Sequence, residues 1–515
     1  MSKGKTVYLL YQKDFSEQGN DRYFVYEDSA FSEVKSEYVI SLDCFVVTHD
    51  FWLISSSLYK KHNKLPPRVV DVVLLSKIVA GTKASLGDVQ PWDIQKTVKP
   101  IYKEAQDFDS YMDMYYRRAR LDIDKYMLFA HKLAEYESQL TKEACSKGES
   151  TRFYSLEMPI HNALTLAACR GVNVDNGIIR IHKDALKLDY YRNLKAFAEK
   201  HDVMYELPSD GDVREKLAQL GYNLDGVDLD FLIDFLPSID GFTDDLRSLQ
   251  RVNKNYRIFN SISYGSMRLR PIAETHWTST SRIYHKAPNL QNISKKYRNI
   301  FIPDPGMALC YVDYDQFEVG IMAALSADPI MKDIYNNGDA YKELATLVFS
   351  DETKRSKAKI LFLSYTYGMS LDNILRSVMQ LGGDIKRARD YFSGFTVFEG
   401  WKETIINKFR DEKQIQTISG NFLNRTSNDE LTSKECRTAV NHVIQGSATY
   451  IFKKALLSLS KVESVELLIP MHDAVLFQHQ ANFDTKLAIK IFEDEMTSAL
   501  DGKITGKASI EPFFE

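Results

Sequence analysis

The sequence lacks any apolar run as long as the roughly 18 residues that a membrane-spanning helix needs. Near its start there is only a short apolar stretch, Val7 to Tyr11, and the acidic residues Asp14 and Glu17 follow at once. This pattern is not typical of a signal or transit peptide. We therefore expect a soluble, cytoplasmic protein without a membrane partner.

Cysteine is scarce. There are five cysteines, and no two of them form a C-x-x-C pair. Their scatter supports neither a disulfide framework nor a cysteine zinc site, and it favours a reducing compartment. They are Cys44, Cys145, Cys169, Cys310 and Cys436.

An excess of basic charge is also absent. The chain has 66 Lys and Arg against 70 Asp and Glu, which gives a formal net charge of −4. A highly basic, histone-like protein is therefore excluded. A local basic groove is not excluded, because net charge averages over the whole surface.

Internal repeats and low-complexity tracts are missing as well, and 44% hydrophobic with 26% charged residues is ordinary for a folded protein. At about 150 residues per domain, 515 residues predict three or four domains or one multilobed enzyme. Runs at Thr6–Tyr11 and Tyr38–Leu42 favour strands, whereas Val69–Val79 and Ser110–Ala144 favour helices.

The rest of the chain predicts α+β architecture. Residues 155–258 are mostly helical in pattern, and turn signals with short apolar runs begin near Pro271. Long helical patterns return at Asp339–Phe409 and Ser433–Leu459, and a β-hairpin is expected at Leu467–Phe477.

Two segments place a carboxylate next to an apolar strand. In Leu309–Glu318 the strand ends at Asp313 and a helix follows, and in Leu467–Phe477 two apolar runs flank Asp473. Asp313 could also be a helix N-cap, and Asp473 an ordinary turn residue. Together the two carboxylates could share a Mg²⁺ site, since this ion is held by one or two carboxylates plus substrate phosphates.

A third segment predicts a helix with a functional stripe. Residues four apart lie on one helix face, so Arg355, Lys359, Leu363 and Tyr367 would line up as two cations, an apolar contact and an aromatic ring. Such a stripe suits a triphosphate at one end and a base at the other. The alternative is the solvated charged end of a core helix.

A fourth segment, Trp277–Ile293, is rich in hydroxyl and amide groups around Arg282. These groups suit contacts with phosphate, sugar and the minor groove of a duplex, although composition alone would indicate only a polar loop.

In this order, the four segments resemble the motifs of the family A DNA polymerases, the group of bacterial DNA polymerase I and many phage replicases. Asp313 to Glu318 resembles motif A, Arg355 to Gly368 motif B, and His472-Asp473-Ala474 motif C. Arg437-x₃-Asn441-x₃-Gln445-Gly446 resembles a further helix of the family. The resemblance begins near Leu156 to Pro159 and Arg170 to Asp175, and it runs to the end of the printed sequence.

Five positions depart from the family pattern. Asp315 stands where Ser is usual, Leu363 where Phe or Tyr is common, and Ala474 where motif C has Glu. Tyr341 and Ser281 replace His and Gly. None of these changes removes Asp313 or Asp473, so activity is expected to survive.

The resemblance implies template-directed addition of deoxynucleoside triphosphates to the primer of a primer–template DNA. It implies two Mg²⁺ ions, with Mn²⁺ as a substitute, held by Asp313, Asp473 and the carbonyl of Tyr314. The catalytic residues would be Asp313, Asp473, Lys359 and Arg355. Nucleotide-binding residues would be Arg355, Lys359, Leu363, Tyr367, Glu318, Gln316 and Tyr341. DNA-binding residues would be Arg282, Asn289, Gln291, Asn292, Arg437, Asn441, Gln445, His472, Arg247 and Arg251.

The resemblance also implies a right-hand polymerase fold of palm, fingers and thumb. We expect thumb and core helices over 136–270, palm over 271–338, fingers over 339–430 and palm again over 431–515. A phage or mobile-element replicase acting as a monomer is expected, and replisome partners are not identified by the sequence.

The segment over 1–135 is expected to be a degenerate 3′–5′ exonuclease-like domain of the RNase H-like α/β type. Such domains hold two metals with an Asp-x-Glu, a second Asp and a Tyr-x₃-Asp, and residues 1–150 contain no Asp-x-Glu. Val39–Phe45 could be a relic of the first motif, but we prefer Val46–Ser55 as the second motif, with Ser55 in place of Asp. Arg118-x₃-Asp122 keeps only the last Asp. An unrelated N-terminal domain is the alternative.

Two other functions compete with this hypothesis. One is a single-subunit RNA polymerase, against which Glu318 argues because a bulky acid beneath the sugar blocks a 2′-hydroxyl. The other is an inactive, nucleic-acid-binding relative, against which the presence of Asp313, Lys359 and Asp473 argues.

Overall fold

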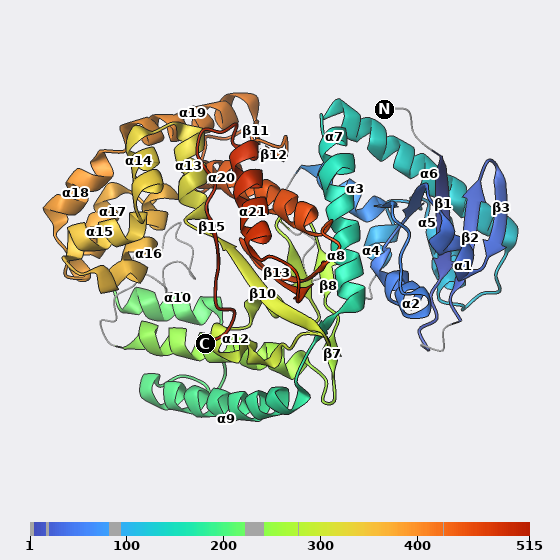
Figure 1. Ribbon diagram of the computed structural model, residues 1–515, viewed down its shortest axis with the longest axis horizontal. Coiled ribbons are helices and arrows are strands. Elements are labelled where there is room, and N and C mark those ends of the chain that lie inside the picture. The colour runs from blue at the N-terminus through green and yellow to red at the C-terminus, as the bar shows by residue number, and fades with distance from the viewer. Residues whose placement is uncertain (1–4, 17–19, 82–93, 222–240, 277, 426) are drawn as a thin grey trace.

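The computed structural model describes residues 5–16, 20–81, 94–221, 241–276, 278–425 and 427–515. Its elements form four lobes (Figure 1): an N-terminal α/β lobe, a central sheet with covering helices, a helical lobe on the far side, and long helices beneath. No helix in the described part of the chain is both long and apolar enough to cross a membrane.

The N-terminal lobe is built on a five-stranded sheet in the order β3-β2-β1-β4-β5. β1, β2 and β3 are antiparallel, whereas β4 and β5 run parallel to β1. The strands are β1 Thr6–Gln12, β2 Arg22–Glu27, β3 Ala30–Val34, β4 Phe45–Thr48 and β5 Val69–Asp71. The helices are α1 Ser36–Ser41, α2 Trp52–His62, α3 Val72–Ala80, α4 Gln95–Val98, α5 Ala105–Tyr115 and α6 Ile123–Ser146.

The structure corrects several expectations for this lobe. The helix expected at Val69–Val79 begins only at Val72, since Val69–Asp71 form β5, and the helix expected over Ser110–Ala144 is interrupted between α5 and α6. The strand expected at Tyr38–Leu42 is the helix α1, which buries Ser36 and Val39 while most of its other side chains face solvent. The domain boundary expected at residue 135 falls inside α6. This helix is continuous, and its later residues Leu140 and Ala144 pack in the same apolar core as β1, so the lobe extends further along the chain.

The central lobe carries a four-stranded sheet in the order β13-β14-β10-β15. Its strands are β10 Met307–Tyr314, β13 Val465–Pro470, β14 Ala474–Gln480 and β15 Ala508–Ile510. The surrounding elements are α7 Ser150–Arg152, η1 Phe153–Glu157, α8 Met158–Arg170, α13 Phe317–Ser326, α20 Ser433–Leu459 and α21 Lys486–Ala499. Shorter pieces are β6 Val172–Asn173, β7 Arg268–Leu269, β8 Ile272–Glu274, β9 Tyr284–Lys286, η2 Leu290–Asn292 and η3 Lys295–Ile300.

The helix expected at Ser433–Leu459 is confirmed as α20, and the expected hairpin as β13 and β14. Thr432 and Glu435 cap the start of α20 reciprocally, which is the capping-box pattern that fixes a helix start.

The helical lobe on the far side contains α14 Pro329–Asn337, α15 Ala340–Phe349, η4 Glu352–Lys354, α16 Arg355–Thr366, α17 Leu371–Gln380, α18 Ile385–Ser393 and α19 Thr396–Glu412, and the hairpin β11 Gln414–Gln416 with β12 Phe422–Asn424 follows it. One large apolar core joins these helices to the central sheet, so the two lobes share their interior.

Beneath the sheet lie α9 Asn176–His201, α10 Asp210–Gln219 and α12 Phe242–Ser261 (Figure 1). They bury a small apolar core of their own around Phe197, Leu217 and Leu246. Residues 222–240, between α10 and α12, lie outside the described residues. The base of α12 is fixed to the central lobe, because Asn255 exchanges two hydrogen bonds with Ser294.

The N-terminal lobe touches the β11–β12 hairpin directly. The backbone N–H of Asn424 donates to the carbonyl of Gly81 at 2.9 Å, and the Phe422 ring occupies the space where a side chain at Gly81 would lie. Gly81 also has a positive φ of +57°, so this junction requires glycine on two counts. Lys77 adds an ion pair with Glu274 at 2.7 Å.

Candidate active site

Two carboxylates meet at one edge of the central sheet. Side chains alternate along β10, so Val312 and Tyr314 point into the core while Asp313 points to the opposite, partly open face. Asp313 pairs in register with Ala474 of β14, and Asp473 lies in the turn immediately before that strand. Asp313 is not the N-cap of α13, because Gln316 occupies that position.

Burial and charge repulsion both act on this pair. Burial, together with the neighbouring Asp473 and Asp315, raises the pKa of Asp313 to about 7. Burial also raises the pKa of Asp473. One oxygen of Asp313 is buried and has no hydrogen-bond partner among the described residues. An unsatisfied, mutually repelling pair of hard oxygen donors is suited to a divalent cation.

The described residues contain no group of three or more His, Cys, Asp or Glu side chains placed to hold a metal ion. A cation here would therefore take its other ligands from main-chain carbonyls, water or substrate, as Mg²⁺ commonly does. Tyr314 can offer only its main chain to the cleft, since its hydroxyl donates to the Phe492 carbonyl in the core.

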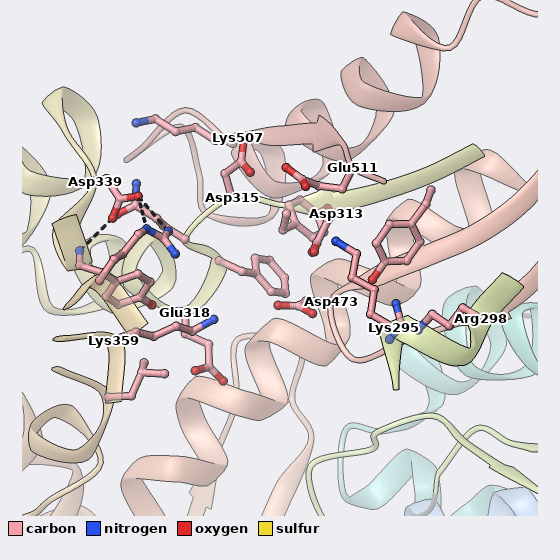
Figure 2. Close-up of a pocket in the computed structure, with 17 residues that line it drawn as sticks. Lys295, Arg298, Asp313, Asp315, Glu318, Asp339, Lys359, Asp473, Lys507 and Glu511 are labelled. Carbon is pink, nitrogen blue, oxygen red and sulfur yellow. Dashed lines mark hydrogen bonds and ion pairs between the residues drawn. The ribbon is translucent and has the colours of Figure 1, made fainter. Parts of the chain in front are cut away.

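The opposite wall of the cleft is cationic. Arg355 and Lys359, one turn apart on α16, both line the cleft, and Lys359 lies across it from Asp473 (Figure 2). Both cations lie over the buried ring of Tyr341, at 5.3 and 5.6 Å from its centroid. Arg355 is held by Asp339 at 2.8 Å. Tyr341, where the family usually has His, therefore brings the two cations to one aromatic ring.

The four residues of the expected stripe on α16 are placed differently. Arg355, Lys359 and Leu363 all line the cleft, whereas Tyr367 lies at the end of the helix, outside the cleft lining. The Tyr367 hydroxyl is buried beside Glu318 and Gln445, and burial, together with Glu318, raises its pKa well above the usual range.

Glu318 rises from the first turn of α13 into the same cleft. Burial raises its pKa, and its carboxylate lies 4.0 Å from the Arg282 guanidinium. Gln316, two residues earlier, acts within the protein, because its amide donates to the Gly338 carbonyl and accepts from the Ala340 N–H. It therefore fixes the loop that carries Asp339, although it also borders the cleft.

The residues expected to bind DNA differ in their position and exposure. Arg437, Asn441 and Gln445 repeat along one face of α20, and the Arg437 side chain packs against Gly368 at the end of the α16 segment. His472, Arg251 and Arg282 are at least partly exposed, as are Arg247, Asn289 and Asn292.

Gln291 differs, because it is buried and its amide is used within the protein. It donates to the carbonyls of Pro470 and Ile283 and accepts from the His285 N–H. It holds the strand that leads to Asp473, and we leave it out of the DNA-contacting set.

The structure adds charged residues to the cleft that the sequence analysis did not assign to the site. The cleft, with a volume of about 700 Å³, lies within the usual size of small-molecule sites. Glu511 and Lys507 flank β15. The hydroxyl of Ser509, in that strand, donates a hydrogen bond to the Asp315 carboxylate at 2.8 Å. The additional charged lining residues are Lys295, Arg298, Asp315, Asp339, Lys507 and Glu511 (Figure 2).

Comparison with known proteins identifies the family of this arrangement. A family model described as DNA polymerase family A matches residues 228–511, which is more than half of the chain. DNA polymerase I of Borreliella burgdorferi is 28% identical over 302 residues, covering 52% of this chain and 32% of that protein. DNA polymerase I of Caldicellulosiruptor bescii is 28% identical over 322 residues, covering 56% and 37%.

The chain thus spans about a third of the length of these curated relatives. Among solved structures, the POL domain of Pol1 from M. smegmatis, in complex with DNA primer-template and dNTP, superposes with a TM-score of 0.74 at 17% identity. That match covers 99% of this chain and 95% of the other, and it confirms the expected right-hand fold class.

Proposed function

Because the chain belongs to DNA polymerase family A, we propose that it is a DNA-templated DNA polymerase that adds deoxynucleotides to a primer 3′ end. One observation carries the proposal most directly. Asp313 on β10 and Asp473 in the turn before β14 line the same cleft of nucleotide size as the cations Arg355 and Lys359. Carboxylates opposite cations are what metal-assisted phosphoryl transfer requires.

Two Mg²⁺ ions, or Mn²⁺ in their place, are the proposed metals. Asp313, Asp473 and the main-chain carbonyl of Tyr314 would hold them, and the buried, unpartnered oxygen of Asp313 supports this assignment. When bound, such ions supply Lewis-acid stabilisation of the attacking and leaving oxygens.

The α16 cations would bind the triphosphate. Lys359 and Arg355 are spaced by one turn and share the Tyr341 ring, so they present two charges in a fixed relation. Arg355 would exchange Asp339 for a phosphate oxygen when the nucleotide enters. Both cations then neutralise the charge that develops on the leaving pyrophosphate.

The duplex would lie against α20 and the loop of Arg282. Arg282 and Gln445 would probe the minor-groove edge of the newest pair, where matched pairs present acceptors in equivalent places. Tyr367 would lie near the templating base. Asn289, Asn292, Arg437, Asn441 and His472 are the further proposed DNA contacts, with Arg247 and Arg251 on the duplex backbone.

Primer extension separates this function from its alternatives. With a DNA template and Mg²⁺, the protein is expected to extend a primer with deoxynucleotides and to reject ribonucleotides. A single-subunit RNA polymerase would prefer ribonucleotides, and an inactive relative would bind the duplex without extending it. Failure to extend any primer under these conditions would contradict the proposal.

For the N-terminal lobe we propose a degenerate exonuclease-like domain of RNase H-like type. The mixed sheet with β1 at its centre supports this. The expected relic positions do not gather at one site: Asp43 is exposed beside Arg68, Ser55 is buried in α2, and Asp122 caps α6 at the surface. Two of its buried carboxylates, Asp50 and Asp71, lie near one another.

Asp71 and Asp50 are engaged by internal hydrogen bonds. Asp71 accepts from the N–H groups of Phe51 and Val73, and Asp50 accepts from Thr97. Burial and the nearby Asp50 raise the pKa of Asp71 to about 6. Around them packs a group of buried aromatic side chains: His49, Tyr11, Tyr111 and Tyr115.

We therefore expect no proofreading. A mismatched 3′ end should not be degraded, because Asp50 and Asp71 are engaged by hydrogen bonds within the lobe. The measurement uses an end-labelled mismatched primer with Mg²⁺ or Mn²⁺, in the Asp473→Asn background so that polymerase chemistry does not interfere. Metal-dependent 3′–5′ shortening that survives in this variant would contradict the prediction.

The affinity of the protein for duplex DNA is expected to fall steeply as the salt concentration rises. Arg247, Arg251 and Lys254 lie on α12, and each phosphate contact releases counterions. With three such contacts, raising salt from 50 to 200 mM should weaken DNA binding roughly fortyfold, and products per encounter should shorten under trap conditions.

Arg251→Ala should lower the slope of log affinity against log salt by about 0.9. An unchanged slope in this variant, or long single-encounter products at high salt, would show that residues other than the α12 cations hold the duplex.

A further inference from the structure

Ser281, which immediately precedes Arg282, lies at the centre of a buried polar cluster. Its hydroxyl is 2.6 Å from Lys453 Nζ, 3.0 Å from Glu157 Oε1 and 2.8 Å from His276 Nδ1. These four residues are all at least 95% buried, and they come from η1, the segment around Arg282 and α20. Segments far apart in the sequence therefore converge on one hydroxyl.

The donors and acceptors around the Ser281 hydroxyl can all be matched. A serine hydroxyl has one proton and two acceptor sites. Ser281 donates to Glu157 and accepts from Lys453, which leaves one acceptor site for His276 and requires that imidazole to carry a proton on Nδ1. Lys453 uses all its donors, since it also reaches the second Glu157 oxygen at 2.6 Å and the Thr275 carbonyl at 2.7 Å.

The charges balance as well. Arg152 bridges Glu157 and Glu149, each at 2.6 Å, so two cations and two carboxylates share the interior. Burial lowers the pKa of Lys453 to about 8 despite Glu157. Burial acts to raise the pKa of Glu157, but Lys453 and Arg152 outweigh it and hold that pKa at about 2. Both groups are charged at neutral pH, and a charged partner strengthens each bond to Ser281.

The backbone conformation of Ser281 is a second, independent observation that this residue is held in place. Ser281 has a φ of +62°, in the left-handed region that favours glycine. Neighbouring bonds hold the same loop: the Ser281 N–H donates to the Thr278 carbonyl at 2.8 Å, and Asn421 donates to the Ser279 carbonyl at 2.9 Å. A serine in this conformation is stable only when its surroundings fix it.

We propose that Ser281 is a positioning residue for Arg282: its hydroxyl, held by Lys453 and Glu157, fixes the backbone from which Arg282 reaches Glu318 and the newest base pair. This inference rests on the proposed function. It gives a role to the serine that stands where the family has glycine, and it makes the Lys453–Glu157 pair a support of the nucleotide site.

A double-mutant cycle tests the inference. Single-turnover incorporation would be measured with Ser281→Ala, Arg282→Ala and the double variant, all as the full chain. Ser281→Ala should lower the efficiency of incorporation about tenfold, the order of magnitude expected when the bonds that hold one hydroxyl are lost. In the Arg282→Ala background it should cause no further loss, because interactions that act through one residue are not additive.

The melting temperature separates positioning from stability. Ser281→Ala should lower it equally in both backgrounds, since Lys453 and His276 lose a partner in either case. Ser55→Ala, which removes another buried hydroxyl far from the cleft, should leave incorporation unchanged. Equal losses of incorporation in both backgrounds would overturn the inference.

Ser281→Gly keeps the backbone conformation accessible but removes the hydroxyl. It should melt closer to the wild type and still incorporate poorly. Wild-type incorporation by this variant would show that the hydroxyl is not used, and it would overturn the inference while leaving the proposed function intact. Absence of primer extension by the wild-type chain would instead overturn the proposed function and the inference with it.

Discussion

Asp313→Asn and Asp473→Asn are each expected to lower primer extension by several orders of magnitude. Asparagine has nearly the shape of aspartate but not its charge, so the variant would lose the carboxylate proposed to hold the metals. Affinity for primer–template DNA should persist, because it depends mostly on phosphate contacts elsewhere.

Neither variant should unfold more easily. Each one removes a repulsion between two carboxylates that are largely buried beside one another, so its melting temperature should stay equal or rise. Mn²⁺ binding followed by electron paramagnetic resonance should weaken in both variants. Asp372→Asn, at an exposed position on α17, is the control and should behave as wild type. Extension near the wild-type rate in either cleft variant would refute the metal assignment.

Glu318→Ala is expected to admit ribonucleotides. The Glu318 side chain occupies the cleft between Arg282 and Tyr367, and shortening it would open space beneath the sugar. Steric discrimination of this kind is worth roughly one to two orders of magnitude in efficiency, so the preference for deoxynucleotides should fall by about that factor. The measurement compares single-nucleotide incorporation of matched ribo- and deoxynucleotides.

Glu318→Gln provides the matched control. It keeps the size of the side chain and removes its charge, so it should still reject ribonucleotides. If Glu318→Ala rejects them as strongly as the wild type, the proposed role as a steric block is wrong. If Glu318→Gln admits them as readily as Glu318→Ala does, charge rather than size sets the preference.

The regular elements near the cleft could be predicted well because local and long-range signals agree there. The helix at Ser433–Leu459 begins with a capping box, and the strand ending at Tyr314 alternates buried and open side chains. At Tyr38–Leu42 the two signals conflict. Tyr, Val and Ile favour strands, yet only one apolar face of this segment is buried, and a short helix satisfies that requirement.

The site could be predicted where it depends on side chains in a motif, and it could not where it depends on sheet pairing. Asp313, Lys359 and Asp473 followed from their spacing. Lys507 and Glu511 reach the cleft because β15 pairs with β10, a contact between segments almost 200 positions apart. Gln291 shows the converse. Its motif suggests a DNA contact at the surface, but the side chain is buried and its amide donates to the Pro470 carbonyl inside the protein.

The strand order of the central sheet also sets an order of events during synthesis. β10 ends at residue 314, but its first neighbour, β14, begins at 474, which is 160 positions later. At about 5–20 residues per second, the ribosome needs roughly 8–32 s to cover that interval. Throughout it, β10 is an apolar strand with two open edges, the form most prone to pair with the wrong partner. A fragment that stops short of β14 would keep that strand in this unpaired state permanently.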